Sequence, residues 1–142
     1  MAAQIQVSQI SESEYVIEKN RTCLIEDNII YVIASGEQTD ELAIQQKQVC
    51  EILGKQINGD LFYLIDVNSC GKNSPGARAI WHQLSEDKKT AGVAVFGIHP
   101  VAKVIASFVI GISRKKNMRF FKTKEESLSW INQIKKNSFL AN

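Results

Sequence analysis

Short runs rich in β-branched, aromatic and other apolar residues, bounded by polar ones, dominate the first part of the chain and predict β-strands. Three such runs cover Glu14–Glu18, Arg21–Glu26 and Ile29–Ala34. Asp27-Asn28, between the last two, tolerates the left-handed backbone of a tight hairpin. Residues 1–13 are more polar and are expected to form an N-terminal extension. The fold should therefore open with antiparallel strands.

A helix and a buried strand are predicted next. Thr39 or Asp40 can cap a helix that ends near Asn58-Gly59. Leu61–Val67 is an almost continuous apolar run, which is typical of a strand that is buried on both faces. We expect this strand to be central in the sheet, with the helix packed against it. The apolar positions of the helix are Leu42, Ile44, Val49, Ile52 and Leu53.

A polar segment separates this strand from the next helix. Asn68–Asn73 is predicted to be a loop, and Ser74-Pro75 combines an N-cap with the proline that is favoured at the first helical position. The helix should run to about Asp87. In open α/β sheets, ligand and partner sites usually lie beyond the carboxyl ends of the parallel strands. Residues 68–74 and 97–100 are therefore the expected functional edge.

The last third of the chain continues the alternation of strands and helices. The pattern predicts a strand at Ala91–Gly97, a helix at Pro100–Ser113 and a strand at Met118–Phe121. Thr123 and Glu126 have the spacing of a capping box and open a final helix. The helix at Pro100–Ser113 has a regular apolar face. The residues of that face are Val101, Val104, Ile105, Phe108 and Ile112.

The predicted element order, βββαβαβαβα, defines an α/β (α+β) fold. It implies a mixed sheet whose initial hairpin is antiparallel and whose later strands are parallel, covered by about four helices. We expect a single domain at residues 14–136 and a short C-terminal tail at residues 137–142. The sequence contains no linker and no internal repeat.

Composition and charge fit an ordinary globular domain. The 142 residues are 44% hydrophobic and 23% charged, with a net charge of +2, so no global field attracts nucleic acid or membrane. Cys23, Cys50 and Cys70 form no metal-ligand pattern, and the first residues lack a signal-peptide pattern, so we expect reduced thiols in a cytoplasmic protein. Val93–Ile112 approaches the length of a membrane span, but Lys103 in its middle argues for a strand and a helix instead.

The segment Asp66–Arg78 could carry chemistry, because nucleophiles and phosphate cradles often lie between a strand and a helix. It lacks the Lys and hydroxyl positions of a P-loop and has no nucleophile-elbow motif. Cys70 and Arg78 are too far apart for a cysteine phosphatase. Asp66, Cys70 and His82 can be drawn as orienting group, nucleophile and base, although a lone cysteine in a turn is more often only a small residue. The sequence predicts no cofactor and, with two histidines, no metal site.

Two serines and a basic cluster have a stronger functional interpretation. Ser69 and Ser74 lie at or near a helix N-terminus, where an added phosphate would meet free amides and a favourable dipole. The alternative is that Ser74 is only a helix cap. The basic cluster could meet anionic lipid headgroups or form a solvated turn. Its members are Arg114, Lys115, Lys116, Arg119, Lys122 and Lys124.

Several segments resemble a known family. They are Leu64-Ile65-Asp66, Arg78, Val93–Ile112 and Phe120–Ile131. Together with the element order, they resemble the STAS domain of anti-sigma factor antagonists, and more closely the small bacterial SpoIIAA-like (STAS/SEC14-like) proteins. The resemblance covers about Arg21–Lys135.

The resemblance implies a non-enzymatic regulatory or protein-interaction module. In STAS antagonists the loop after the central strand carries a phosphorylatable serine in an Asp-Ser-Ser-Gly context. The nearest match is Asn68-Ser69-Cys70-Gly71, in which Asn replaces the Asp and Cys replaces the second Ser. The candidate phospho-switch or partner-binding residues are Asn68, Ser69, Ser74 and Arg78.

Two other functions are open alternatives. A SEC14-like protein would bind a lipid or small apolar ligand beneath the helix at Pro100–Ser113, and an enzyme would require an unusually reactive Cys70 thiol. The same helix could supply a homodimer patch. The candidate ligand or interface residues are Val101, Val104, Ile105, Phe108, Arg114, Lys115 and Lys116.

Overall fold

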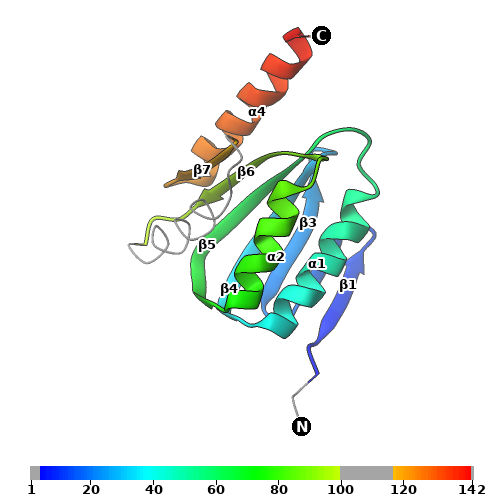
Figure 1. Ribbon diagram of the computed structural model, residues 1–142, viewed down its shortest axis with the longest axis vertical. Helices are drawn as coiled ribbons and strands as arrows, with labels where there is room; N and C mark the ends of the chain where they lie inside the picture. The colour runs from blue at the N-terminus through cyan, green and yellow to red at the C-terminus, as the bar shows by residue number, and fades with distance from the viewer. Residues whose placement is uncertain (1–3, 100–116, 142) are drawn as a thin grey trace.

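A single seven-stranded mixed sheet organises the chain (Figure 1). The computed structural model describes residues 4–99 and 117–141, with side chains described as far as residue 137. The strands follow one another in sequence order across the sheet. They are β1 (Val7–Ser11), β2 (Glu14–Ile17), β3 (Asn20–Ile25), β4 (Ile29–Gln38), β5 (Leu61–Asn73), β6 (Thr90–Phe96) and β7 (Met118–Phe121). The helices are α1 (Asp40–Gly54), α2 (Pro75–Glu86) and α4 (Lys124–Ala141).

The two halves of the sheet differ in strand direction. Strands β1 to β4 form an antiparallel meander, whereas β4 to β7 are mutually parallel. This confirms the predicted mixed sheet with an antiparallel opening. The described part of the chain has three of the four predicted helices, because the segment predicted as a helix at Pro100–Ser113 lies outside the described residues.

Strand β1 was not predicted from the sequence. Its residues belong to the segment expected to be an N-terminal extension, yet they pair with β2 from Val7 opposite Ile17 to Ser11 opposite Glu14. All five residues of β1 are exposed, so burial leaves no alternating apolar signal in this strand. Strand β1 is held in the sheet by backbone hydrogen bonds to β2, which depend little on the side chains.

The turn between β3 and β4 is a hairpin, as predicted, but its left-handed residues differ by one position. Glu26 and Asp27 have φ values of 50° and 67°, whereas the sequence favoured Asp27 and Asn28. Ile25 pairs with Ile29, which leaves three residues in the loop. The position of the turn was therefore predicted correctly, but the residues with left-handed backbone lie one position earlier than predicted.

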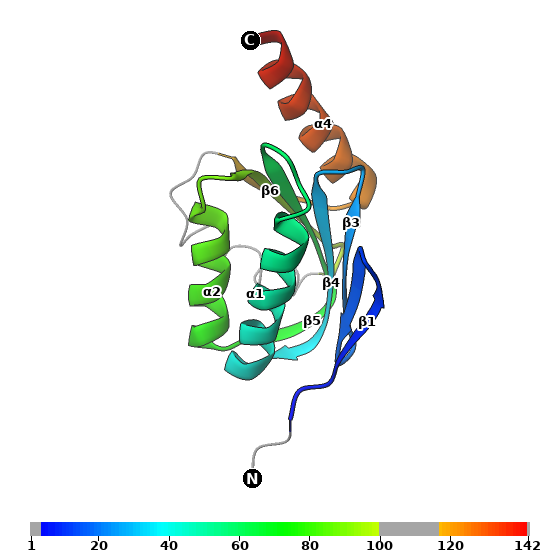
Figure 2. The same ribbon diagram turned by 90° about the vertical axis from the view of Figure 1, so that its right-hand side faces the viewer.

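Helices cover the two faces of the sheet separately. Figures 1 and 2 show α1 and α2 side by side on one face and α4 on the other. The larger core cluster lies under α1 and α2 and includes Ile17, Ile30, Val32, Leu53, Tyr63, Ile65, Trp81 and Val95. The smaller cluster lies under α4 and consists of Ile29, Phe62, Leu64, Ala94, Phe96 and Ile131. Because β5 supplies both clusters, its first half is buried on both faces, as the sequence predicted.

Each helix begins at a residue that caps it. The Thr39 side chain accepts a hydrogen bond from the Leu42 amide at the start of α1, and Thr123 accepts one from the Glu126 amide at the start of α4. Helix α1 ends at Gly54, earlier than predicted. There the Lys89 ammonium donates to the carbonyl oxygen of Gly54, the last residue of α1, and to that of Ile57 beyond it.

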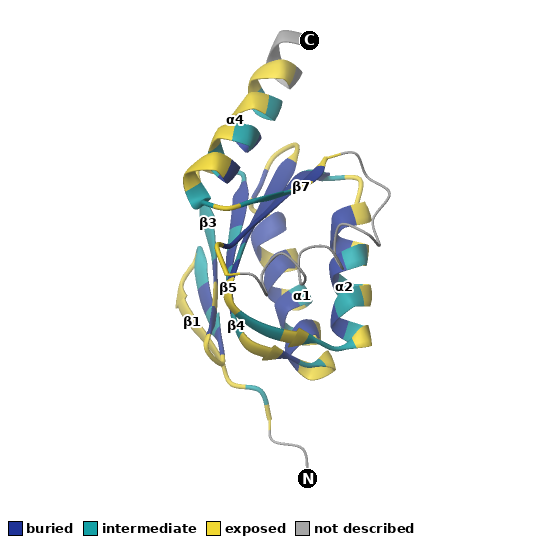
Figure 3. Cartoon of the chain, turned by 90° about the vertical axis from the view of Figure 1, so that its left-hand side faces the viewer, coloured by how far each residue is buried: buried dark blue, intermediate teal, exposed yellow. Residues whose placement is uncertain are grey.

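Helix α4 is longer than the sequence suggested. It continues to Ala141, through most of the segment expected to be a C-terminal tail. Figure 3 shows α4 extending beyond the sheet, with much of its surface exposed in yellow. Its packing against the sheet includes the fully buried Ile131 and extends to the partly buried Ile134.

Candidate functional site

Strand β5 continues well past the point at which the sequence predicted a loop. Asn68–Asn73 is strand, and this second half of β5 is called the β5 extension below. It pairs in parallel with the end of β4, with Ser35 opposite Ser69 and Gly36 opposite Cys70. The predicted polar loop was therefore wrong. The polar composition is explained by exposure of the strand, since only part of each residue here is covered.

Two irregularities allow this long strand to follow β4. The register shifts between Ile33 and Ser35 and again between Gly36 and Gln38 of β4. At each shift β5 has one residue more than β4, which is the property of a β-bulge. A Cβ atom on Gly71 would lie 3.2 Å from the backbone of Gly36. Glycine at this position therefore permits the close approach of the two strands.

A buried pair of side-chain amides fixes the end of β4, which lies next to the β5 extension in the sheet. The Gln38 side chain donates to the Asn20 side-chain oxygen at 3.1 Å, and the Ser35 amide donates to the same oxygen at 2.7 Å. Gln38 and Asn20 are only 6% and 2% exposed. Buried amides that satisfy one another in this way favour one backbone arrangement over others. The β5 extension is therefore paired to a strand whose backbone position is fixed.

Asn68 connects the middle of β5 to the segment that follows β6. Its backbone and side-chain N–H groups both donate to Asp66 Oδ1 at 2.9 Å, and its side-chain oxygen accepts a hydrogen bond from the Ile98 amide at 2.9 Å. This places Ile98 next to the β5 extension. Ile98 is 74% exposed, more than any other large hydrophobic residue in the described part of the chain. Ile98 lies beside Asn68, and Ser69 and Lys72 further along the β5 extension are also exposed, so this part of the molecule has the character of a contact surface.

Ser74 serves two neighbouring helices at once. Its hydroxyl oxygen accepts a hydrogen bond from the Ala77 amide at 3.0 Å and thereby caps α2. The same hydroxyl donates to Asp40 Oδ1, in the first turn of α1. Helix α2 has no acidic residue in its own first turn. Asp40 therefore supplies the negative charge that the α2 dipole favours.

Gly76 leaves room for the Asp40 carboxylate. A Cβ atom at Gly76 would lie 2.3 Å from Asp40 Oδ1, so a larger residue would displace the carboxylate. The space where a phosphate on Ser74 would meet the α2 amides is thus filled by Asp40. Ser74 was predicted as a helix cap from the sequence. Its hydrogen bond to Asp40 was not predicted, because the two residues are far apart in the chain.

The other candidate residues of this segment are placed separately. Ser69 is exposed on the β5 extension, and Arg78 is partly buried one turn into α2. The Cys70 thiol donates to the Gly71 carbonyl, and burial raises the pKa of Cys70 to about 11. A thiol with a raised pKa carries little thiolate at neutral pH.

The sequence also suggested Asp66, Cys70 and His82 as a catalytic group. Asp66 bonds to Asn68, and the buried His82 Nδ1 has no hydrogen-bond partner. In the part of the chain that the structure describes, no hydrogen bond joins the three side chains. These three residues therefore do not form a nucleophile activated by a base.

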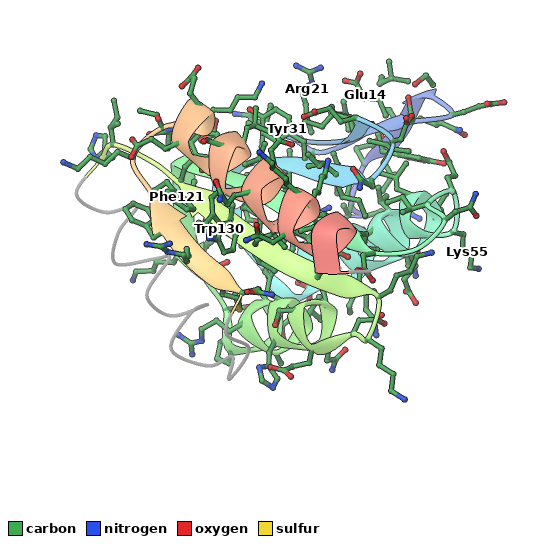
Figure 4. All side chains as sticks on the ribbon, turned by 90° about the horizontal axis from the view of Figure 1, so that it is seen from above. Glu14, Arg21, Tyr31, Lys55, Phe121 and Trp130 are labelled. Carbon is green, nitrogen blue, oxygen red and sulfur yellow. The ribbon has the colours of Figure 1, made fainter. Side chains whose placement is uncertain are left out.

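A second partly open surface lies on the α4 face of the sheet. Figure 4 shows Glu14, Arg21 and Tyr31 on this side, next to the start of α4. The Arg21 guanidinium donates to Glu14 Oε2 at 2.6 Å, and Lys124 Nζ lies 4.7 Å from the centre of the Tyr31 ring. Burial raises the pKa of Tyr31. These residues pair with one another, so they form a satisfied polar surface.

A cavity of about 210 Å³ lies at the opposite end of β5 from the extension, lined by residues that include Leu61, Tyr63 and Lys89. Within residues 4–99 and 117–141, no cluster of metal-ligating side chains occurs, and no helix has the length and apolarity to cross a membrane. The predicted ligand or interface residues lie outside the described residues. They are Val101, Val104, Ile105, Phe108, Arg114, Lys115 and Lys116.

Comparisons with known proteins identify the fold. The family described as "Domain of unknown function (DUF7793)" matches residues 23–135. An uncharacterised protein of the DUF3478 family with a SpoIIAA-like fold, from Shewanella loihica PV-4, has a TM-score of 0.57 and 18% identity, covering 92% of this chain and 98% of that chain. The anti-sigma factor antagonist SpoIIAA in its unphosphorylated form has a TM-score of 0.49 and 9% identity, covering 90% and 97%. No curated protein matches the sequence. The SpoIIAA-like fold predicted from the sequence is confirmed.

Proposed function

The chain belongs to the family of the domain of unknown function DUF7793, and we propose that it is a non-enzymatic, STAS-like regulatory module that binds a protein partner in the cytoplasm. The partner face comprises four exposed residues in the β5 extension and just after β6. These residues are Asn68, Ser69, Lys72 and Ile98.

One observation carries the proposal. Ile98 is 74% exposed and is also fixed in place, because its amide donates to the Asn68 side chain. Exposing a large apolar side chain is unfavourable in water, so a partner that covers it gains the free energy of burying that side chain. Because Ile98 is already held in place, little entropy is lost in ordering it on binding. A held isoleucine among polar neighbours has the composition of an interface centre with its polar rim.

The neighbouring backbone supports the same role. The β5 extension is paired to β4, and β4 is held by Gln38 and Asn20. A surface built on paired strands loses little conformational entropy on binding. Binding to this preformed surface should therefore cost less entropy than binding to a loop that becomes ordered only in the complex.

The chemistry of the face supports binding over catalysis. Cys70, the only strong nucleophile in the segment, has a pKa raised by burial to about 11. Of the two candidate phospho-switch residues, Ser69 fits better, because its side chain is exposed on the partner face. Ser74 is committed to the α2 cap and to Asp40. A phosphate on Ser69 would add about two negative charges to the partner face.

The proposal is tested by quantitative affinity capture from the host with the full chain as bait. The test variant is Ile98→Asp/Lys72→Glu, which replaces the exposed isoleucine by a carboxylate and reverses the charge at position 72. A matched control, Ile52→Asp/Lys88→Glu, makes the same changes at exposed positions away from the face, where Ile52 is 43% exposed.

We expect proteins captured by wild type to be retained by the control and lost from the test variant. Retention by both variants, with both baits folded by circular dichroism, would show that the partner face is not where binding occurs.

A further inference from the structure

Strand β1 is a sheet edge with a free backbone. It pairs only with β2 in the described part of the chain. The Glu18 amide donates to the Gln6 carbonyl at 2.8 Å, so the pairs that exchange hydrogen bonds with β2 are those of Gln6 and Ser8. Successive residues of an antiparallel strand direct their backbone groups to opposite sides. The N–H and C=O groups of Val7 and Gln9 therefore point away from β2.

Exposed apolar side chains gather along the same edge. Val7 and Ile10 in β1 are 40% and 59% exposed, and Ile44 in α1 is 48% exposed. A groove of about 590 Å³ runs between the strand and the helix. It is lined by Gln4, Ile5, Gln6, Val7, Glu41, Ile44 and Gln45. An added strand would therefore find backbone partners at β1 and space for its side chains against α1.

The edge lacks the charges that usually protect such strands. Natural edge strands carry lysine, other charges or proline to prevent pairing, whereas no charged side chain occurs before Glu12. The register shift between Gln9 and Ser11 limits regular pairing to the residues before it. A neutral strand can pair with its own copy without placing like charges opposite one another.

We propose that β1 is a homodimer interface, in which two copies of the chain pair their β1 strands antiparallel about a two-fold axis. The axis passes through Ser8, so Val7 of each copy exchanges backbone hydrogen bonds with Gln9 of the other. The two sheets become continuous, and Val7, Ile10 and Ile44 of each copy are covered.

Charge and area both favour a second copy as the occupant. A two-fold interface uses the same surface on both partners, so β1, which has no charged side chain, meets an equally uncharged strand. A specific interface needs roughly 1,000 Å² of total buried surface, which a short strand pair alone does not supply. The apolar side chains of β1 and α1 beside the strand extend the contact on both copies. The dimer edge is distinct from the partner face, which lies in the β5 extension and just after β6.

Sedimentation equilibrium of the full chain tests the proposal. We expect wild type to dimerise with a dissociation constant below roughly 1 mM. Val7→Lys/Ile10→Lys places like charges near the axis and should weaken the dimer by about tenfold or more. Ile98→Lys is the matched control and should leave the association unchanged. Gln9→Pro removes an outward amide without adding charge and should also weaken the dimer.

A cysteine at Ser8 tests the register. Residues on the axis lie opposite each other as a non-hydrogen-bonded pair, with Cα atoms about 4.5 Å apart, which a disulfide can span. Ser8→Cys should give a covalent dimer under mild oxidation, with the linked peptide identified by mass spectrometry. A monomeric wild type overturns the proposal, as does a dimer that survives both β1 variants. In either case the edge would not serve self-association.

Discussion

The two halves of β5 are parts of one continuous strand and yet follow different rules. Leu61–Val67 is buried from both sides and pairs with β4 and β6. Within residues 4–99 and 117–141, the β5 extension pairs only with β4, and it carries bulges and is largely polar and exposed. The first half is specified by the hydrophobic effect, whereas the second is specified by backbone pairing and by a few side-chain hydrogen bonds.

The difference shows how one strand can combine stability with recognition. The buried half anchors the extension to the core, so exposed residues can vary in chemistry without losing their position. Asn68 stands at the boundary, since it bonds to Asp66 in β5 and to Ile98 after β6. The comparison predicts large stability effects before this boundary and mainly binding effects after it.

The largest expected effect is that of Leu64→Ala. Leu64 has no exposed surface and lies in the cluster beneath α4, so truncation leaves a cavity and should cost about 3 kcal/mol of the free energy of unfolding. Ser69→Ala in the extension should change it by no more than about 0.5 kcal/mol. Urea denaturation of both variants measures the difference, and comparable losses would contradict the division of β5.

The next effect concerns alkaline pH. Burial raises the pKa of Cys50, which lies beneath the first half of β5, to about 12, above its ordinary value near 9. Since the unfolded chain then loses its thiol proton first, stability is full below pH 9 and falls as pH rises towards 12. At pH 10.5 the loss should be about 2 kcal/mol.

Cys50→Ala provides the control for this titration. The variant should be less stable at pH 8 but should lose less additional stability between pH 8 and pH 10.5 than wild type. Cys70→Ala removes a thiol whose pKa is raised to about 11, so it should also reduce this loss. Equal pH slopes for wild type and Cys50→Ala would show that this thiol does not carry the effect.

A smaller effect is expected at the junction of the two helices. Ser74→Ala removes the α2 cap and the partner of Asp40, and should cost about 1 kcal/mol. Asp40→Asn should cost less, because an amide oxygen can still accept from Ser74. A double-mutant cycle measured by thermal unfolding should show coupling of about 0.5 kcal/mol or more. Strict additivity would mean that the two side chains do not support each other.

The smallest change in stability is expected for Asn68→Ala, because Asn68 is exposed. The substitution should instead release the segment at Ile98, whose amide loses its acceptor. Hydrogen exchange should accelerate at that amide while amides in the buried half of β5 keep their protection. Unchanged exchange at Ile98 would show that Asn68 does not hold it.

Most of the fold was predictable because burial leaves a pattern in the sequence. Leu61–Val67 was recognised as central from its apolar run, and the caps at Thr39, Ser74 and Thr123 marked the helix starts. Strand β1 and the β5 extension were missed for the same physical reason. An exposed strand is held by its backbone, which has no sequence signature, and its side chains are those of a loop.

The candidate site was predictable in position but not in structure. The rule for parallel strands predicted a site at residues 68–74 and 97–100, and the hydrogen bond between the Asn68 side chain and the Ile98 amide brings these two segments together. Asp40 and Ile98 act through contacts between distant segments, which no local pattern reveals. For Ile98, an apolar residue next to a strand end gave no sign that it would be exposed.

The partner face is tested most directly by site-specific photo-crosslinking in the host. A photoreactive amino acid is placed at Ser69 in one strain and at Gln48, exposed on α1, in a control strain. The account predicts a discrete cross-linked protein from position 69 that is absent from position 48 and disappears with Ile98→Asp. Cross-links from position 48 alone, or from both positions regardless of Ile98, would contradict a partner face on the β5 extension.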